Sequence, residues 1–169
     1  MSGRAHLHLL CGKAGAGKST LAKMLADRHR AILISEDVWL FRLFGDQMQT
    51  FEDYRRVSQR GKTVVGPLVV DLLKAGLNVV LDFPANTRAT REWCRSLAVA
   101  ADAESTLHVV AASDAVCLER IEKRNAERPE GSHHITPEVF AHVSSFFEPP
   151  EAAEGLSIEM HAQSPFGSA

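Results

Sequence analysis

A glycine-rich segment near the start of the chain constrains its fold more than any other feature. Residues 12–19 read Gly-Lys-Ala-Gly-Ala-Gly-Lys-Ser and match G-x-x-x-x-G-K-[ST] at every fixed position. An apolar run of strand length, 6–11, precedes the segment, and apolar residues at helical spacing follow it over 20–26. Glycine permits positive φ and close backbone approach, so successive N–H groups and the helix N-terminus can point at one anion. The sequence therefore predicts a strand, a phosphate-binding loop and a helix in succession.

The polar residues of this loop suit separate parts of a nucleoside triphosphate. Lys18 would reach the β- and γ-phosphates, and the Ser19 hydroxyl would bind Mg²⁺. The alternative interpretation is a glycine-rich turn that only starts a helix, which the flanking strand and helix patterns disfavour. We expect nucleotide contacts along the whole loop, namely Gly12, Lys13, Ala14, Gly15, Ala16, Gly17, Lys18, Ser19 and Thr20.

Length and composition fit one domain. The chain has 169 residues, of which 45% are hydrophobic, enough to bury a core, and we expect residues 1–169 to form a single domain. A formal net charge of −2 argues against a generally basic nucleic-acid-binding surface.

The cysteines and the apolar segments of the sequence bear on the cellular compartment of the protein. Cys11, Cys94 and Cys117 are widely spaced in apolar stretches, so we expect buried thiols rather than disulfides or a zinc site. Nothing resembles a signal peptide or a membrane-spanning run of about eighteen apolar residues. We therefore expect a cytoplasmic protein without a membrane partner.

Strands and helices are predicted to alternate along the chain. Further strands are expected at 31–34, 78–82, 105–112 and 156–160, and helices from 38, over 51–75, from 87, over 114–126 and from 137. Gly76 would end the second of these helices, and Gly61, Gly66 and Pro67 allow it to be split in two. A tail is expected from about 161, frayed from Gln163.

This alternation predicts an α/β fold of three layers, α/β/α, with a five-stranded parallel sheet covered on both faces. Ligands bind at the carboxyl ends of the strands in such sheets. The phosphate-binding loop, the Glu36-Asp37 pair and Asp82 each follow a strand, so one site would hold all of them.

Two aspartates follow predicted strands at positions that suit magnesium binding and proton transfer. Asp82 ends an apolar strand, the place of a Walker B carboxylate that holds Mg²⁺ opposite Ser19; the alternative role is a helix N-cap. Asp37 follows the second strand and could take the proton of an incoming hydroxyl. Ser35, Glu36 or Asp37 could instead cap the next helix, and the choice between Glu36 and Asp37 as base stays open.

Three arginines recur every four residues at the end of a predicted helix. Arg120, Arg124 and Arg128 would share one helix face, which could be an ordinary solvated surface. Beside a phosphate site, they could instead belong to a lid, about 124–136, that covers the β–γ bridge and stabilises charge in the transition state. We expect Arg120 and Arg124 to contact nucleotide, and Arg124 and Arg128 to act in catalysis.

Other candidates have weaker patterns. His133 and His134 lack supporting metal ligands nearby, so we expect loop histidines that contact substrate or solvent. Trp39, Phe41 and Phe44 could line an acceptor pocket or pack into the core.

Four segments together resemble the small bacterial P-loop kinases: Gly12–Thr20, Ile34–Asp37, Val80–Asp82 with Asn86, and Arg124-Asn125-x-x-Arg128. The likeness is to kinases of the AAA_33 type, related to polynucleotide 5′-kinase, chloramphenicol phosphotransferase and the zeta toxins, and it covers roughly residues 4–148. The resemblance implies a three-layer P-loop NTPase fold with a short lid, and ATP·Mg²⁺-dependent phosphorylation of a hydroxyl. Asp37 matches the acceptor-side base, and Arg124 and Arg128 match the lid arginines.

Two departures from polynucleotide kinases bear on the acceptor. Leu40 stands where those enzymes carry arginine, and 82–86 reads Asp-Phe-Pro-Ala-Asn rather than Asp-Thr-Asn or Asp-Ala-Thr-Asn. A small-molecule kinase is therefore the favoured hypothesis, with ATP and an unidentified hydroxyl compound as partners and no protein partner predicted. The alternatives are a nucleotide-dependent switch or ATPase regulatory module and, less favoured, a polynucleotide 5′-hydroxyl kinase, because nucleic acid is an unlikely partner at this net charge.

Overall fold

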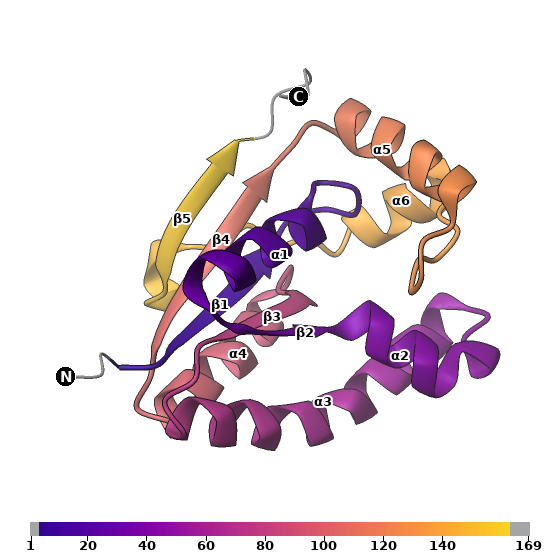
Figure 1. Ribbon diagram of the computed structural model, residues 1–169. Helices are drawn as coiled ribbons and strands as arrows, with labels where there is room; N and C mark the ends of the chain where they lie inside the picture. The colour runs from indigo at the N-terminus through magenta and orange to yellow at the C-terminus, as the bar shows by residue number, and fades with distance from the viewer. Residues whose placement is uncertain (1–3, 163–169) are drawn as a thin grey trace.

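Strands and helices alternate along the chain in the computed structural model, which describes residues 4–162 (Figure 1). The expected fraying from Gln163 lies outside the described residues. The strands are β1 (His6–Cys11), β2 (Ile32–Ser35), β3 (Val79–Pro84), β4 (Glu104–Ala111) and β5 (Ser157–Ala162). The helices are α1 (Lys18–His29), α2 (Glu36–Phe44), α3 (Phe51–Lys74), α4 (Arg88–Ala100), α5 (Asp114–Glu127) and α6 (Pro137–Ser144), with short 3₁₀ turns η1 (Gly45–Gln47) and η2 (Ala152–Glu154).

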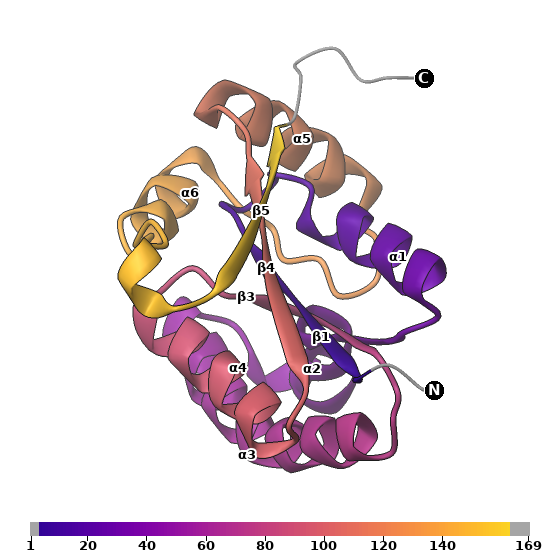
Figure 2. The ribbon, with the colours of Figure 1, turned by 90° about the vertical axis from the view of Figure 1, so that its left-hand side faces the viewer.

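One parallel sheet of five strands, in the order β2-β3-β1-β4-β5, forms the middle layer. Viewed along the sheet, α1 and α5 cover one face and α3 and α4 the other (Figure 2). The predicted three-layer α/β/α fold is thereby confirmed. Because β1 lies between β3 and β4, the loop after β1 emerges at the centre of the sheet's carboxyl edge.

The core fills both spaces between the sheet and its helices. Leu7 and Leu9 of β1 pack toward α3 and α4, whereas Leu10 packs toward α1, and all three are fully buried. Burying one such leucine contributes about 1.5–3 kcal/mol, so the alternation of faces along β1 anchors both layers. Cys11, Cys94 and Cys117 are buried free thiols, as expected.

The segment 51–74 forms one helix, which confirms the helix predicted over 51–75; the alternative that it is split in two is wrong. Thr50 and Asp53 form a capping box at its start, and Pro67 lies inside it. A Cβ on Gly61 would lie 3.3 Å from Leu40 of α2, and one on Gly66 would lie 3.5 Å from Leu97 of α4. Close packing against α2 and α4 therefore holds the helix together across its weak positions.

The end of α3 follows the predicted pattern. Gly76, just beyond the helix, has φ +81°, and its N–H donates to the Leu73 carbonyl while the N–H of Leu77 donates to that of Leu72. A left-handed residue at this position satisfies the last carbonyls of the helix.

A buried arginine ties α4 to the segment that follows α6. Arg91 is 1% exposed, and its guanidinium donates to both carboxylate oxygens of Glu154 at 2.6 and 2.8 Å. It also donates to the carbonyls of Glu148 (2.8 Å) and Ala85 (3.2 Å). A buried charge is tolerated only with such partners, so this cluster fixes the return of the chain toward β5. Within residues 4–162, no helix combines the length and apolar character needed to cross a membrane.

Candidate active site

The glycine-rich loop connects β1 to α1 at the carboxyl edge of the sheet, as predicted. Gly15 has φ +76°, and a Cβ there would lie 2.5 Å from the carbonyl oxygen of Cys117 in α5. Gly17, with φ +107°, is the N-cap of α1. Only glycine fits the space and the backbone conformation at position 15, so the loop curls tightly and presents the start of α1 to a ligand.

Asn86, two residues after β3, holds the first residue of this loop. The Gly12 N–H donates to Asn86 Oδ1 at 2.8 Å, and Asn86 Nδ2 donates to the Gly12 carbonyl at 2.9 Å. The side chain therefore connects the end of β3 directly to the loop. The sequence pattern contains Asn86 but gives no reason for this contact, because it depends on β3 lying beside β1.

The ammonium of Lys18 lies inside the loop. Its Nζ donates to the carbonyl oxygens of Gly12 at 2.6 Å and Lys13 at 2.9 Å. Burial lowers the pKa of Lys18, and the nearby carboxylates of Asp82 and Asp37 oppose this shift. The lysine and the two aspartates therefore share one electrostatic environment.

Asp82 lies in β3, opposite Ser35 of β2, and the strand continues two residues beyond it to Pro84. Burial raises the pKa of Asp82, while a hydrogen bond with Ser19 and the charge of Lys18 lower it. A hydroxyl and a carboxylate oxygen side by side are hard ligands of the kind that Mg²⁺ prefers. The residues present therefore fit a magnesium ion between Ser19 and Asp82.

Asp37 is the second residue of α2 and comes close to the same group. Burial, together with the charge of Asp82, raises the pKa of Asp37 to about 6, and Lys18 and Arg124 partly offset this effect. A carboxyl whose pKa is raised by burial and by a second carboxylate, beside a lysine and an arginine, belongs to a compact titratable cluster of the kind found at functional sites.

Glu36 differs from its neighbour because both of its carboxylate oxygens are engaged. It is 2% exposed and accepts hydrogen bonds from the Tyr54 hydroxyl at 2.7 Å and the Ser58 hydroxyl at 2.5 Å. Burial and the adjacent carboxylates raise the pKa of Tyr54 well above its usual value, so the phenol stays a donor. Glu36 therefore fastens the start of α2 to α3.

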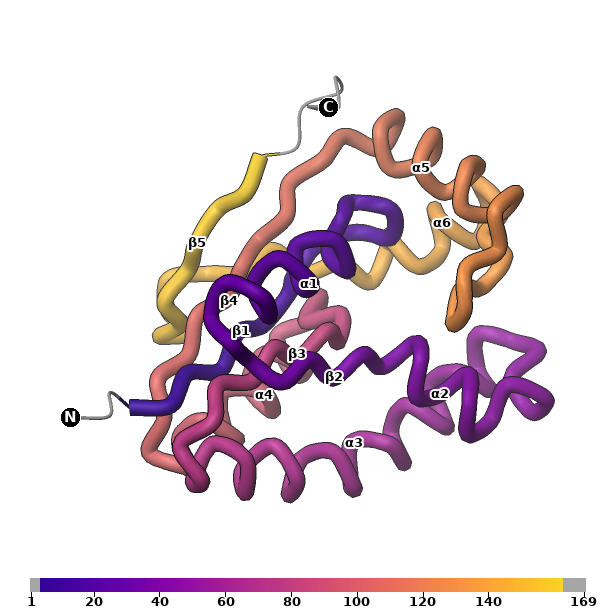
Figure 3. Tube along the Cα trace, viewed as in Figure 1, coloured from indigo at the N-terminus to yellow at the C-terminus, as the bar shows by residue number. Residues whose placement is uncertain are grey.

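The loop between α5 and α6 packs on the start of α2 (Figures 1 and 3). Gly131 is buried with φ +78°, and a Cβ there would lie 3.0 Å from the Asp37 carbonyl carbon and the Val38 nitrogen. Beside it, Glu130 accepts two hydrogen bonds from Arg42, at 2.6 and 3.0 Å. The predicted lid segment thus lies directly against the backbone of Asp37.

The other end of this loop is closed by a side chain. Asn125 donates to the Ile135 carbonyl at 2.7 Å and accepts from the Ile135 N–H at 3.1 Å. The chain therefore leaves α5 and returns to it within ten residues, which holds the loop in a defined shape.

The three candidate arginines occupy different places. Arg120 donates to the Ala16 carbonyl of the glycine-rich loop at 2.9 Å. Arg124 acts on the pKa of Asp37 and Lys18, and its buried Nε has no hydrogen-bond partner among the described residues. Arg128 is exposed, in a left-handed conformation at the C-cap of α5. The structure thus brings Arg120 and Arg124 to the loop and leaves Arg128 one turn further out.

A histidine and the α2 aromatics complete the surroundings. The His133 ring lies edge-on to Tyr54 at 5.7 Å, burial lowers its pKa, and its buried Nε2 has no hydrogen-bond partner in the part of the chain described. His134 is exposed. Trp39 and Phe41 are exposed, at 37% and 46%, and so do not pack into the core, whereas Phe44 is half-buried.

A glycine-rich loop at the centre of a parallel sheet, with a lysine, two carboxylates and an arginine gathered beside it, defines a P-loop nucleotide-binding protein. The AAA_33 family model, described as an AAA domain, matches residues 7–150, and the chain belongs to this family. No curated protein matches the chain in sequence.

Solved structures share the fold at low identity. A protein from Chloroflexus aurantiacus J-10-fl that carries a provisional kinase name has a TM-score of 0.74 and 22% identity, over 95% of this chain and 89% of the other. Kti12 of Chaetomium thermophilum, in complex with ADP-AlF3, has a TM-score of 0.68 and 17% identity, over 92% and 88%. The APS kinase of Mycobacterium tuberculosis, in complex with AMPPNP and APS, has a TM-score of 0.65 and 18% identity, over 96% and 91%. At these identities the likeness establishes the fold.

Proposed function

We propose that this protein transfers the γ-phosphate of ATP to a hydroxyl group of a small molecule. The observation that carries the proposal is the carboxylate of Asp37, half-buried and close enough to Asp82, Lys18 and Arg124 for their charges to act on its pKa. Nucleotide binding alone needs the loop, its lysine and a magnesium ligand; it does not need a second carboxylate on the acceptor side.

The donor half consists of the P-loop and its neighbours. The backbone amides of residues 12–20 and the ammonium of Lys18 bind the phosphates, and Arg120 supports the loop at Ala16. Ser19 and Asp82 would hold Mg²⁺, which would supply positive charge against the β- and γ-phosphates.

On the acceptor side, Asp37 accepts the proton of the attacking hydroxyl and orients the oxygen for in-line attack. Its pKa of about 6 leaves the carboxylate mostly ionised at neutral pH while keeping its proton affinity close to the working range. Glu36 is a positioning residue, because its bonds to Tyr54 and Ser58 fix the turn from which Asp37 projects.

The lid supplies positive charge and excludes water. Arg124 donates to the transferring phosphoryl group through the guanidinium, whose Nε is buried with no protein partner within residues 4–162. Arg128, one turn along, joins it when the loop closes over nucleotide. Packing of Gly131 on Asp37 couples lid position to the base.

The surroundings of Asp37 favour a small acceptor over a polynucleotide. Leu40, at the position of the polynucleotide-kinase arginine, is 3% exposed and packs against Gly61. A buried leucine cannot supply the positive charge that a nucleic-acid backbone requires, and the chain as a whole carries a net charge of −2.

A screen of hydroxyl metabolites, aminoglycoside and other hydroxyl-bearing antibiotics and 5′-hydroxyl oligonucleotides for ADP release tests the proposal. The expected result is stoichiometric ADP and phosphorylated product with one small-molecule class. Asp37→Asn should bind ATP·Mg²⁺ like the parent but lose turnover, whereas Lys18→Ala should lose at least about tenfold in nucleotide affinity. Unchanged turnover in Asp37→Asn would refute the assignment of the base.

The likeness to Kti12 in its ADP-AlF3 complex favours one second candidate, a nucleotide-dependent switch. A switch would bind nucleotide tightly, hydrolyse it slowly without an acceptor and form no phosphorylated product. It would also tolerate Asp37→Asn without loss of hydrolysis, so the same variant separates the two functions.

A further inference from the structure

A row of histidines crosses the face of the sheet that α1 and α5 cover. His8 of β1, His108 of β4 and His161 of β5 all point to this face, and the register places His108 directly opposite Glu159. Residues 159 and 161 are two apart on one strand, so their side chains share a face. The row lies on β1, β4 and β5, whereas Asp82 lies on β3.

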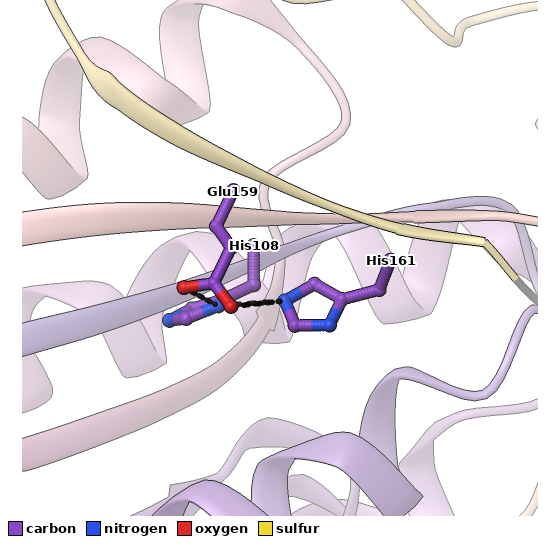
Figure 4. A group of neighbouring side chains, drawn as sticks. All are labelled: His108, Glu159 and His161. Atoms are coloured by element: carbon purple, nitrogen blue, oxygen red, sulfur yellow. Dashed lines mark hydrogen bonds and ion pairs between the residues drawn. The ribbon is translucent and has the colours of Figure 1, made fainter.

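Two histidines of this row and Glu159 bring ligand atoms together. His108 Nδ1 lies 3.0 Å from His161 Nε2, and the two oxygens of Glu159 lie 3.6 Å from the former and 3.5 Å from the latter. Figure 4 shows the carboxylate directed at both imidazoles. Four-coordinate zinc, with bonds of about 2.0–2.1 Å, separates its ligand atoms by about 3.3–3.4 Å. The observed spacing therefore requires only small side-chain shifts to hold an ion.

A second set of contacts orients the innermost ligand. His108 is 2% exposed, and its Nε2 lies 3.0 Å from Nδ1 of His8, itself 4% exposed. A hydrogen bond from His108 Nε2–H to His8 leaves the lone pair of Nδ1 directed at Glu159 and His161. Such an outer partner, which fixes the tautomer and the ring, is typical of metal-binding histidines. The buried Nε2 of His8 has no hydrogen-bond partner within residues 4–162.

We propose that His108, Glu159 and His161 form a binding site for a divalent transition-metal ion, with zinc as the best match. Two imidazoles and one carboxylate suit zinc and its neighbours in the first transition row, whereas Mg²⁺ and Ca²⁺ prefer an all-oxygen set. The side chain of Glu159 is 57% exposed and that of His161 22%, so a fourth position faces solvent.

The consequence of binding is local. The site joins β5, a strand at the edge of the sheet whose residues are mostly exposed, to the buried strand β4. A bound ion would fasten this edge strand without taking part in phosphotransfer.

Titration of the metal-free protein with Zn²⁺ by calorimetry tests the site, with Co²⁺ substitution to report the ligand field in visible absorption. We expect one ion per chain, and a loss of at least about tenfold in affinity for both Glu159→Gln and His161→Ala. His142→Ala, at an exposed histidine of α6, should bind like the parent. Asp82→Asn should also keep this ion, because the phosphotransfer site is separate.

Hydrogen exchange supplies an independent measurement. Zinc should slow exchange of β5 amides in the parent and not in Glu159→Gln, whose exposed and isosteric change leaves the fold intact. The proposal is overturned if no stoichiometric zinc binds, or if binding is unaffected by both ligand variants. Loss of the ion in Asp82→Asn with retention in the ligand variants would overturn it too, because the ion would then belong to the phosphotransfer site.

Discussion

Asp37→Asn should stabilise the protein while abolishing turnover. A pKa raised by burial from 3.8 to about 6 means that the unfolded chain ionises this carboxyl more readily than the native protein does. Above pH 6 the ionised carboxylate therefore destabilises the native state. At about 1.4 kcal/mol for each tenfold change, the difference corresponds to about 3 kcal/mol. Asparagine keeps the shape and cannot ionise.

The pH dependence of the stability gain distinguishes the removal of a buried, ionisable carboxyl from other ways in which Asp37→Asn could stabilise the protein. The destabilisation of the native state by ionised Asp37 is fully present above pH 6 and falls to about half near pH 5. It vanishes below 3.8, where Asp37 is protonated in both the native and the unfolded state. The gain of Asp37→Asn in free energy of unfolding should therefore be about 3 kcal/mol at pH 7.5 and about 1.6 kcal/mol at pH 5. For a chain of this length, 3 kcal/mol is an increase in Tm of about 6–12 °C.

Urea unfolding of the nucleotide-free protein, followed by tryptophan fluorescence at both pH values, measures the gain. Asp71→Asn, on the exposed side of α3, is the matched control and should change stability by less than about 0.5 kcal/mol. If Asp37→Asn is no more stable than the parent at pH 7.5, or gains equally at pH 5, the carboxylate is not destabilised by burial and the pKa argument for the base fails.

Three further outcomes follow from the geometry. If Asp37 is the proposed base, its protonation should make kcat/KM of the parent fall about tenfold for each pH unit below about 6. Rates of ADP release in stopped-time assays that do not fall below pH 6 would contradict this. Gly131→Ala should lower kcat, because the added Cβ would press on the backbone of Asp37. Gly76→Ala is the control: Gly76 has a similar φ and nothing within 4 Å, so this variant should lose only the stability of about 1–2 kcal/mol that a left-handed non-glycine residue costs. Equal kcat values in the two variants would refute the proposed coupling between the 124–136 loop and Asp37. Arg91→Ala should destabilise by about 3–5 kcal/mol in urea unfolding, because Glu154 is left as an unpaired buried charge; a loss below 1 kcal/mol would show that water replaces the arginine.

The sequence predicts the layout of this protein where local patterns suffice. The P-loop motif, the apolar strands and the glycine after α3 each act through backbone geometry or burial within a short segment, and all were placed correctly. The convergence of Asp37 and Asp82 also follows, because parallel strands bring their carboxyl ends to one edge.

Contacts between distant segments were not predictable. Nothing local shows that Gly131 packs on Asp37, or that Arg91 is buried, since arginine is usually exposed and only the tertiary partners explain it. The sequence predicts a helix over 51–75 but leaves a split at Pro67 open for the same reason, because packing rather than helix propensity decides whether the helix continues. The histidine cluster required the register of β4 and β5, which spacing along the chain does not determine.

The amide of Asn86 has a consequence for how the P-loop meets its ligand. Between β1 and β3 the regular register ends near Leu10, whose carbonyl accepts the N–H of Ala85 at 2.9 Å, and the side chain of Asn86 then pairs with Gly12 like one more rung of the ladder. Ordering one residue of backbone costs about 1–2 kcal/mol in entropy. Because Asn86 already orders Gly12 when the protein folds, nucleotide binding does not bear this entropy cost. The base of the loop is therefore a rigid extension of the sheet before any nucleotide binds. A substitution at Asn86 would therefore weaken phosphate binding by loosening the backbone of Gly12.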